Sequence, residues 1–537
     1  MADGDVGLTA YTVGGLLLAG LLRFLYRLYQ VRKRAHYLPG PPHSWIWGHM
    51  KCFPDALRKL PNNSTPHITL LQIAKDYDLE DYFFLDSWPV QDLILITLGK
   101  RSADQFTCER SMPKSPLVAD FTECVGGKQN LVADDGHRWK TWRAAFNPGF
   151  SNAHLMTLVP DIVDEVEVFC KIMSGFAVEN KLFRMEKHVT RLTIDVIGKI
   201  VLDMDFHSQI KDHPLVSAFE SSCKWMKLGF MFQPSELIDL RRPVIHWMNS
   251  RTMNKFIDDA LMTRWRTRNQ RGKTKYVIDL ALETYLKDKG QSVQDNDELD
   301  PGFRKDVLDQ VKIFLFAGHE TSASTISYCL YHISRHPDIS KKVHDELDRV
   351  FGHGANVGER IREEATLLNK LDYMMAVIKE TLRMHAPANS VRSGSKDFFF
   401  VDPNTGEKFS TDGIQLMAMA LGNHMHQDWL DPYNFRPERF LNGEAVEGAW
   451  VPFAKAPRSC IGQELATIEI RITLAMVLSE YEFTPSYDEL HKLKGDGSGY
   501  NSETRGVQKA WGQEAYQTGI MAKPREGMPL RVRRRER

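Results

Sequence analysis

One short segment places a cysteine where it could do chemistry. The segment Phe453 to Leu465, FAKAPRSCIGQEL, carries Cys460 two residues after Arg458, and a helix is predicted to begin near Gly462 or Gln463. Backbone amides and the positive end of a helix favour a thiolate over a thiol, and the thiolate is the form that binds metals. The simplest interpretation of any single cysteine, however, is an inert buried thiol.

A second candidate group lies within an unusually long apolar stretch. Residues Arg304 to Ser334 contain no proline, so they can form about 46 Å of continuous helix. Its middle reads AGHETS, Ala317 to Ser322, where small residues would let a flat molecule approach the backbone. Thr321 is placed to donate a hydrogen bond to the carbonyl of Ala317, one turn back. A close helix crossing would explain the same small residues.

Charged residues recur at helical spacing further along. Glu380 and Arg383 lie three residues apart in a predicted helix that ends near Pro387, so they share one face. Such a pair is usually a weak surface contact. The segment FRPERF, Phe435 to Phe440, supplies Arg439 as a third charge that could convert the pair into a buried network.

Taken in order, these motifs resemble the cytochrome P-450 family of haem-thiolate monooxygenases. The ordered set covers residues 40–537, and its members are Trp139-x-x-x-Arg143, Ala317-Gly-x-Glu-Thr321, Glu380-x-x-Arg383, Pro437-Glu-Arg-Phe440 and Phe453…Arg458-x-Cys460-x-Gly462. The resemblance implies haem b and a mainly α fold, one large helix-rich domain with small β-sheets, because the family is built in this way.

The resemblance also assigns roles to individual residues. Cys460 would be the axial ligand of the haem iron, with Phe453 packed beneath it. Arg458, Arg392, Trp139 and Arg143 would hold the haem propionates, and the backbone at Ala317 and Gly318 would face the ring. Thr321 and Glu320 would deliver protons to bound dioxygen. Glu380, Arg383 and Arg439 would form a structural triad.

The implied reaction inserts one atom of O2 into a lipophilic substrate, using electrons from a separate NADPH-dependent flavoprotein reductase. The motif style is most similar to that of filamentous-fungal members that act on polyketides, terpenoids or alkaloids. Two alternatives use the same ligand: a haem-thiolate isomerase or dehydratase, and a non-catalytic haem sensor or carrier. The Glu320-Thr321 pair argues against both, because neither needs proton delivery.

The elements that must position these residues are mostly helical. Apolar residues recur at spacings of three and four from His154, His188 and Lys341. Strands are expected from Asp92, in a hairpin from Asp397 with its turn at Asn404 to Gly406, and at the chain end from Met528. By the same resemblance, four segments would surround the substrate: Ser111 to Gly136, Leu228 to Pro234, Ala388 to Val391 and a segment from Tyr516.

Composition excludes several function classes. Lysine plus arginine equals aspartate plus glutamate at 69 each, so no overall field attracts nucleic acid. The seven cysteines include no CxxC pair, which argues against structural zinc and ferredoxin-type clusters. The spacing His424-x-His426 is metal-like, but the family has a structural turn there.

The amino end is predicted to anchor the protein. Residues Val6 to Leu22 carry no charge, and Arg32, Lys33 and Arg34 follow them. The positive-inside rule then leaves the body in the cytosol, as a single-pass protein of the endoplasmic reticulum membrane. We expect an anchor and basic stop over residues 1–36, a proline-rich hinge over 37–45 and the haem domain over 46–537.

Two departures from the family pattern concern the site. Ala456 stands where a glycine is usual, but Pro457 restricts residue 456 to extended backbone angles, so we expect a negative φ there. The segment from Pro387 to Arg392 is one residue shorter than in many members, which weakens the assignment of Arg392.

Overall fold

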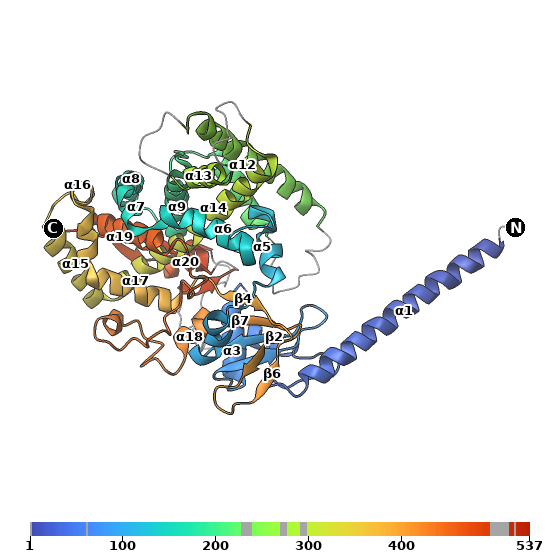
Figure 1. Cartoon of the computed structure of the whole chain (residues 1–537). Coiled ribbons are helices and arrows are strands. Elements are labelled where there is room, and N and C mark those ends of the chain that lie inside the picture. The colour runs from blue at the N-terminus through green and yellow to red at the C-terminus, as the bar shows by residue number, and fades with distance from the viewer. Residues whose placement is uncertain are drawn as a thin grey trace.

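A computed structural model describes residues 3–60, 63–226, 239–268, 276–289, 298–494, 515–519 and 522–536. Helices dominate these residues (Figure 1), and small sheets pack among and beside them. The helices are α1 (Asp3–Ala35), α2 (Cys52–Arg58), α3 (Pro66–Asp76), α4 (Lys100–Asp104), α5 (Pro116–Gly126), α6 (Gly136–Phe146), α7 (Asn152–Thr157), α8 (Val159–Glu179), α9 (Met185–Leu202), α10 (Pro214–Lys224), α12 (Arg241–Arg266), α13 (Val277–Lys289), α14 (Pro301–Arg335), α15 (Pro337–Phe351), α16 (Val357–Glu363), α17 (Asp372–Met384), α18 (Ala420–Met425), α19 (Gln463–Glu480) and α20 (Tyr487–Lys494).

The largest sheet lies beside the base of α1. Its strand order is β1 (Tyr82–Leu85), β2 (Ile94–Thr97), β7 (Gln415–Ala418) and β4 (Ser390–Ser393), and only the β2–β7 pair is parallel. A second sheet joins β3 (Phe183–Arg184), β11 (Pro529–Arg534) and β8 (Tyr481–Pro485). The hairpins are β5 (Phe399–Val401) with β6 (Lys408–Ser410), and β9 (Gln517–Thr518) with β10 (Lys523–Pro524).

Helix α14 is the long helix that the sequence predicts, and it runs through the core. Asp300 caps it by accepting a hydrogen bond from the N–H of Phe303 at 2.9 Å, and Pro301 occupies the first turn. Residues on all its faces are buried against α9, α5, α17 and α19. The prediction of one mainly helical domain with small sheets is confirmed.

The predicted helix from His154 is wrong in one respect. It is two helices, α7 and α8, separated at Leu158. Pro160 has no N–H to continue the hydrogen bonds of α7, but it fits the first turn of α8. The other expected helices, the strand from Asp92 and the hairpin from Asp397 occur as α9, α15, β2 and β5–β6.

Helix α1 projects away from the body as a long rod with the amino terminus at its far end (Figure 1). Among the described residues it is the one helix long and apolar enough to cross a membrane, over Thr12–Ala35. It remains helical through the basic cluster and ends at Ala35, which is buried in the body.

Candidate haem site

A cavity of about 450 Å³ lies between α14 and the cysteine loop. Cys460 and Phe453 line one wall, and Ala317, Gly318 and Thr321 line another. Most of its surface is apolar. The sequence prediction that the loops 111–136 and Ala388–Val391 surround it agrees with its lining, which includes Lys114, Leu117, Val118, Phe121, Thr122, Val132, Ala388, Asn389, Ser390 and Val391. Leu228 to Pro234 lie outside the described residues, and Tyr516 does not line the cavity.

The cysteine loop holds its thiol against the start of α19. The N–H of Cys460 donates to the carbonyl of Phe453 at 2.8 Å, which closes the loop. Gly462 caps α19, and its N–H contacts the sulfur. Burial raises the pKa of the Cys460 thiol, while that N–H and the charge of Arg143 act to lower it. The two lowering contributions are those that would stabilise a thiolate ligand.

The opposite wall is formed by the middle of α14, where the otherwise buried helix opens to the cavity. Ala317 is exposed to the cavity, and the hydroxyl of Thr321 donates to its carbonyl at 2.8 Å, as the sequence predicts. Gly318 has a different role, since a Cβ there would lie 2.9 Å from the side chain of Ile197 on α9. Gly318 is therefore small because α14 and α9 pack closely there, whereas Ala317 is small where the helix faces the open cavity.

Glu320 and Thr321 do not face the same space. Successive helical residues point about 100° apart, and Glu320 turns toward the carboxyl-terminal hairpin. There Lys523 lies 2.7 Å from Oε1 of Glu320 and 3.0 Å from Glu186. Both carboxylates raise the pKa of Lys523, although its burial acts to lower it. The other oxygen of Glu320, Oε2, is buried without a hydrogen-bond partner among the described residues.

One end of the cavity is strongly cationic. The guanidinium of Arg458 stacks on Trp139 at 4.2 Å and lies 3.2 Å from Asp135. Arg392 is buried, and its Nε and Nη1 have no hydrogen-bond partner within the described part of the chain. Burial, followed by the charges of Arg392 and Arg458, lowers the pKa of Lys114 to about 7. Asp135 offsets part of this positive charge, and the remainder favours the binding of an anion.

Arg143 lies behind the loop rather than in the cavity. It donates from Nη1 to the carbonyl of Ser459 at 2.9 Å. Trp139 and Arg392 also lie just outside the cavity wall, whereas Arg458 forms part of it. Of the four predicted propionate ligands, Trp139, Arg392 and Arg458 therefore lie at the cationic end, and Arg143 lies behind the loop. Only Arg458 lines the cavity directly.

Glu380, Arg383 and Arg439 form one network in which all three side chains are fully buried. Glu380 accepts from Arg383 at 2.8 and 2.9 Å and from Arg439 at 3.1 Å. The two arginines also donate to the carbonyls of His424 and Leu430, so the network ties α17 to the chain that leads to the cysteine loop. The sequence left two interpretations open, a surface pair and a buried network, and the structure shows the buried network.

Lys114 and Glu469 are among the cavity residues to which the sequence analysis gives no haem-site role. Lys114 belongs to a loop expected only to contact substrate, but its bridge to Arg392 brings it to the cationic end. Glu469 on α19 is buried, lines the cavity and has Oε1 without a partner among the described residues. Burial raises the pKa of Glu469 to about 8. In the sequence, Glu469 could be recognised as an acidic residue within the largely apolar segment LATIEIRITLAMV.

The histidines of the metal-like spacing already have protein partners. His424 accepts from the N–H of Val451 at 2.8 Å and lies 3.1 Å from the carbonyl of Arg383. His426 contacts Asp81 and Asp428. Both contacts agree with a structural turn.

The backbone strain in the cysteine loop is at Ala454, not at Ala456. Ala454 has a φ of +54°, whereas Ala456 is not among the positive-φ residues, as Pro457 predicts. A side chain in the left-handed region is disfavoured, so Ala454 is the position in this loop where glycine would fit better.

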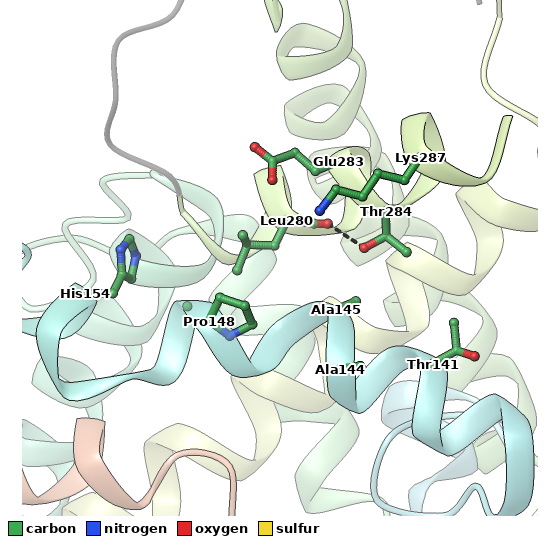
Figure 2. A pocket seen from close by; sticks show the side chains of 10 residues that line it. Thr141, Ala144, Ala145, Pro148, His154, Leu280, Glu283, Thr284 and Lys287 are labelled. Carbon is green, nitrogen blue, oxygen red and sulfur yellow. Dashed lines mark hydrogen bonds between the residues drawn. The ribbon is translucent and has the colours of Figure 1, made fainter. Parts of the chain in front are cut away.

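A second cavity, of about 470 Å³, lies between α6 and α13 (Figure 2). Its lining includes Ala144, Ala145, His154, Glu283 and Lys287, and none of the predicted site residues. It lacks the thiol and the cationic end of the first cavity.

The residues of the first cavity fit haem. A thiol on one wall suits an iron ligand, and an apolar space suits the macrocycle. Lys114, and Arg392 with two nitrogens that lack a partner among the described residues, suit the propionates. The volume of the cavity lies within the usual range of small-molecule sites.

Comparison with known proteins gives a consistent result. A family model described as Cytochrome P-450 matches residues 98–504. The cytochrome P-450 monooxygenase polC of Polytolypa hystricis is 33% identical over 542 residues, covering 98% of this chain and 96% of that protein. The cytochrome P-450 monooxygenase acrF of Aspergillus aculeatus is 34% identical over 507 residues, covering 89% and 99%. The crystal structure of the cytochrome P450DA heme domain has a TM-score of 0.69 at 20% identity, covering 93% of this chain and 97% of that one.

Proposed function

Because the chain belongs to the cytochrome P-450 family of monooxygenases, we propose that it oxidises a lipophilic small molecule of fungal secondary metabolism, such as a polyketide, terpenoid or alkaloid. The balanced reaction is RH plus O2 plus two electrons and two protons, giving ROH and water. The relatives polC and acrF are monooxygenases of two fungi, which supports the monooxygenase class and a fungal setting.

The observation that carries the proposal is a single cavity with Cys460 and Thr321 on different walls and an apolar remainder. Leu117, Val118 and Phe121 on α5 contribute to that apolar surface. Burying a lipophilic substrate against them removes apolar area from water, at about 25 cal/mol per Å². Few polar groups are then needed to orient the substrate.

Haem ligated by Cys460 supplies the reductive activation of dioxygen when it is bound. Arg458, Arg392 and Lys114 would hold its propionates, and Phe453 would limit water near the thiolate. The hydroxyl of Thr321 would hold a proton donor on the opposite side. Glu320 would act through a displacement of its contact with Lys523, because its carboxylate faces away from the cavity.

Electrons would come from a membrane-bound NADPH-dependent flavoprotein reductase. We place its docking surface on α6, behind the cysteine loop, where Lys140 is exposed and Arg143 contacts Ser459. A cationic docking surface suits an acidic partner and makes association salt-dependent. Helix α1 would place both proteins on the same cytosolic face of the endoplasmic reticulum membrane.

The test combines the purified full-length haem protein, the reductase, NADPH and extracts of a host strain that lacks the gene. Under ¹⁸O2, one metabolite should disappear and a product should gain one ¹⁸O atom. Cys460→Ser should lose both turnover and the thiolate position of the reduced CO-bound absorption band. Conversion without NADPH, or without ¹⁸O incorporation, would favour an isomerase or dehydratase instead.

A further inference from the structure

The carboxyl-terminal part of α1 is not a free tether, because Arg32 is buried inside the body. Its side chain is 1% exposed and forms an ion pair with Asp86, which is fully buried. Arg32 also donates from Nη2 to the carbonyls of Trp88 at 2.7 Å and Ile46 at 3.3 Å. Its neighbour Lys33 is exposed. A residue that the sequence assigns to a basic stop is therefore a tertiary contact.

Asp86 is built to receive that arginine. Its second oxygen lies 3.0 Å from Nε2 of His43, and its backbone N–H donates to His49 at 2.9 Å. Gly48 has a φ of +58°, and a Cβ there would lie 2.6 Å from Nη1 of Arg32. The loop before α2 thus closes over the guanidinium with only enough room for glycine. A buried charge pair of this kind holds its two elements in one geometry.

Further contacts extend along α1 on both sides of this ion pair. Phe24 packs on Trp88 with ring centroids 4.7 Å apart, and Tyr29 stacks on Trp45 at 6.2 Å. Arg34 donates to the carbonyl of Ser410 at 2.8 Å in the hairpin β5–β6. From Phe24 to Arg34 the helix rises about 15 Å, so docking is distributed over three turns. Figure 1 shows the rod meeting the body at this sheet region.

An exposed apolar patch surrounds the docked end of the helix. It consists of Tyr37, Trp45, Ile46, Trp47 and Val90, and Tyr37 and Ile46 are 82% and 71% exposed. The hydrocarbon core of a bilayer is about 30 Å thick, which is about twenty helical residues. A span that begins with the uncharged run at Val6 therefore ends near Tyr26, and the rest of the apolar stretch, up to Ala35, lies beyond the hydrocarbon core. Tyr29 lies about 5 Å beyond that point, in the headgroup layer, and Trp45 packs on it.

We propose that the Arg32–Asp86 ion pair locks α1 to the body in one geometry, and that it thereby fixes the orientation in which this patch meets the headgroup layer of the bilayer that α1 spans. The inference rests on the proposed spanning role of α1. It replaces the expected hinge over residues 37–45 with a rigid junction. Tryptophan and tyrosine are the residues that prefer this layer, because their rings are apolar and their N–H or O–H groups reach water.

The chain allows a direct test, because no tryptophan precedes Trp45 and quenching by membrane lipid therefore reports on the body alone. Full-length haem-loaded protein is placed in phosphatidylcholine vesicles, with or without lipid brominated near the headgroup end of the acyl chain. Energy transfer to haem is the same in both vesicle types, so a difference in tryptophan emission between them reports quenching by the brominated lipid. The double variant Trp45→Phe, Trp47→Phe should lose at least half of the quenching seen in the wild type.

The ion pair is tested with Arg32→Met, and Arg27→Met, an exposed arginine of the same helix, is the matched control. Arg32→Met should keep its haem and float with the vesicles, yet lose at least half of the quenching, whereas Arg27→Met should retain it. Wild-type protein that floats with the vesicles but shows no quenching, or a double variant quenched as strongly as the wild type, would overturn the membrane-contact surface and leave the anchor intact. Undiminished quenching in Arg32→Met would overturn the orienting role of the ion pair. Protein that fails to float would overturn the anchor and, with it, this inference.

Discussion

Neutralising Glu380 should destabilise the protein more than the loss of any exposed charge. Its carboxylate balances two guanidinium groups, those of Arg383 and Arg439, and accepts the backbone N–H of Arg436 at 2.8 Å. In Glu380→Gln the shape is kept, but the amide nitrogen faces arginine donors and two buried cations lose their counter-charge. Breaking a fully buried ion pair costs about 3–5 kcal/mol.

This free energy can be converted into a melting temperature. Unfolding entropy is about 2.1 cal/mol/K per residue, or about 1 kcal/mol/K for a chain of this size. The expected decrease in Tm is therefore about 4 °C. Haem occupancy should fall as well, because Arg383 holds the carbonyls of His424 and Pro432 on the chain that leads to the cysteine loop.

The assay follows the haem absorption band and far-UV circular dichroism during heating, together with haem content after purification. Glu482→Gln is the control, because Glu482 pairs with Arg533 at the surface, where ion pairs contribute about 0–1 kcal/mol. If Glu380→Gln melted within 1 °C of Glu482→Gln and kept its haem, the buried charge balance would not be what stabilises this network.

Four further outcomes test the site. Thr321→Ala should keep its haem but lower product per NADPH by ~10²-fold or less, with the missing electrons recovered as peroxide; unchanged coupling would place proton delivery elsewhere. Arg392→Gln should release haem faster to apomyoglobin, because one propionate loses a buried charged partner; an unchanged transfer rate would contradict that contact. Ala454→Gly should raise Tm by about 1 °C through relief of about 1 kcal/mol of backbone strain, whereas Ala456→Gly should not; the reverse order would move the strain to residue 456. Burial, and then the charge of Arg383, lowers the pKa of His385 to about 3, so between pH 7 and 5 only the unfolded state, with a pKa of about 6.5, takes up a proton at this residue. The wild type should therefore lose about 2 kcal/mol more stability over this pH range than His385→Gln. Equal losses in the two proteins would contradict the buried neutral ring.

Local chemistry made much of the fold and site predictable. The thiol position of Cys460, the cap at Gly462 and the bond from Thr321 to Ala317 all depend on residues within a few positions of one another. The uninterrupted apolar run around Thr321 likewise required a buried helix. Backbone geometry acts over one or two turns, so the order and spacing of the motifs were enough to predict these features.

Features that depend on distant partners were decided by the tertiary structure. The direction of Glu320 follows from Lys523, about two hundred residues later in the chain, and the burial of Arg32 follows from Asp86. Lys114 became part of the cationic end only because its strand-like bridge brought it beside Arg392. A sequence shows which charges a chain carries, but the energy of each charge depends on its burial and on its neighbours, and these are set only when segments far apart along the chain pack together.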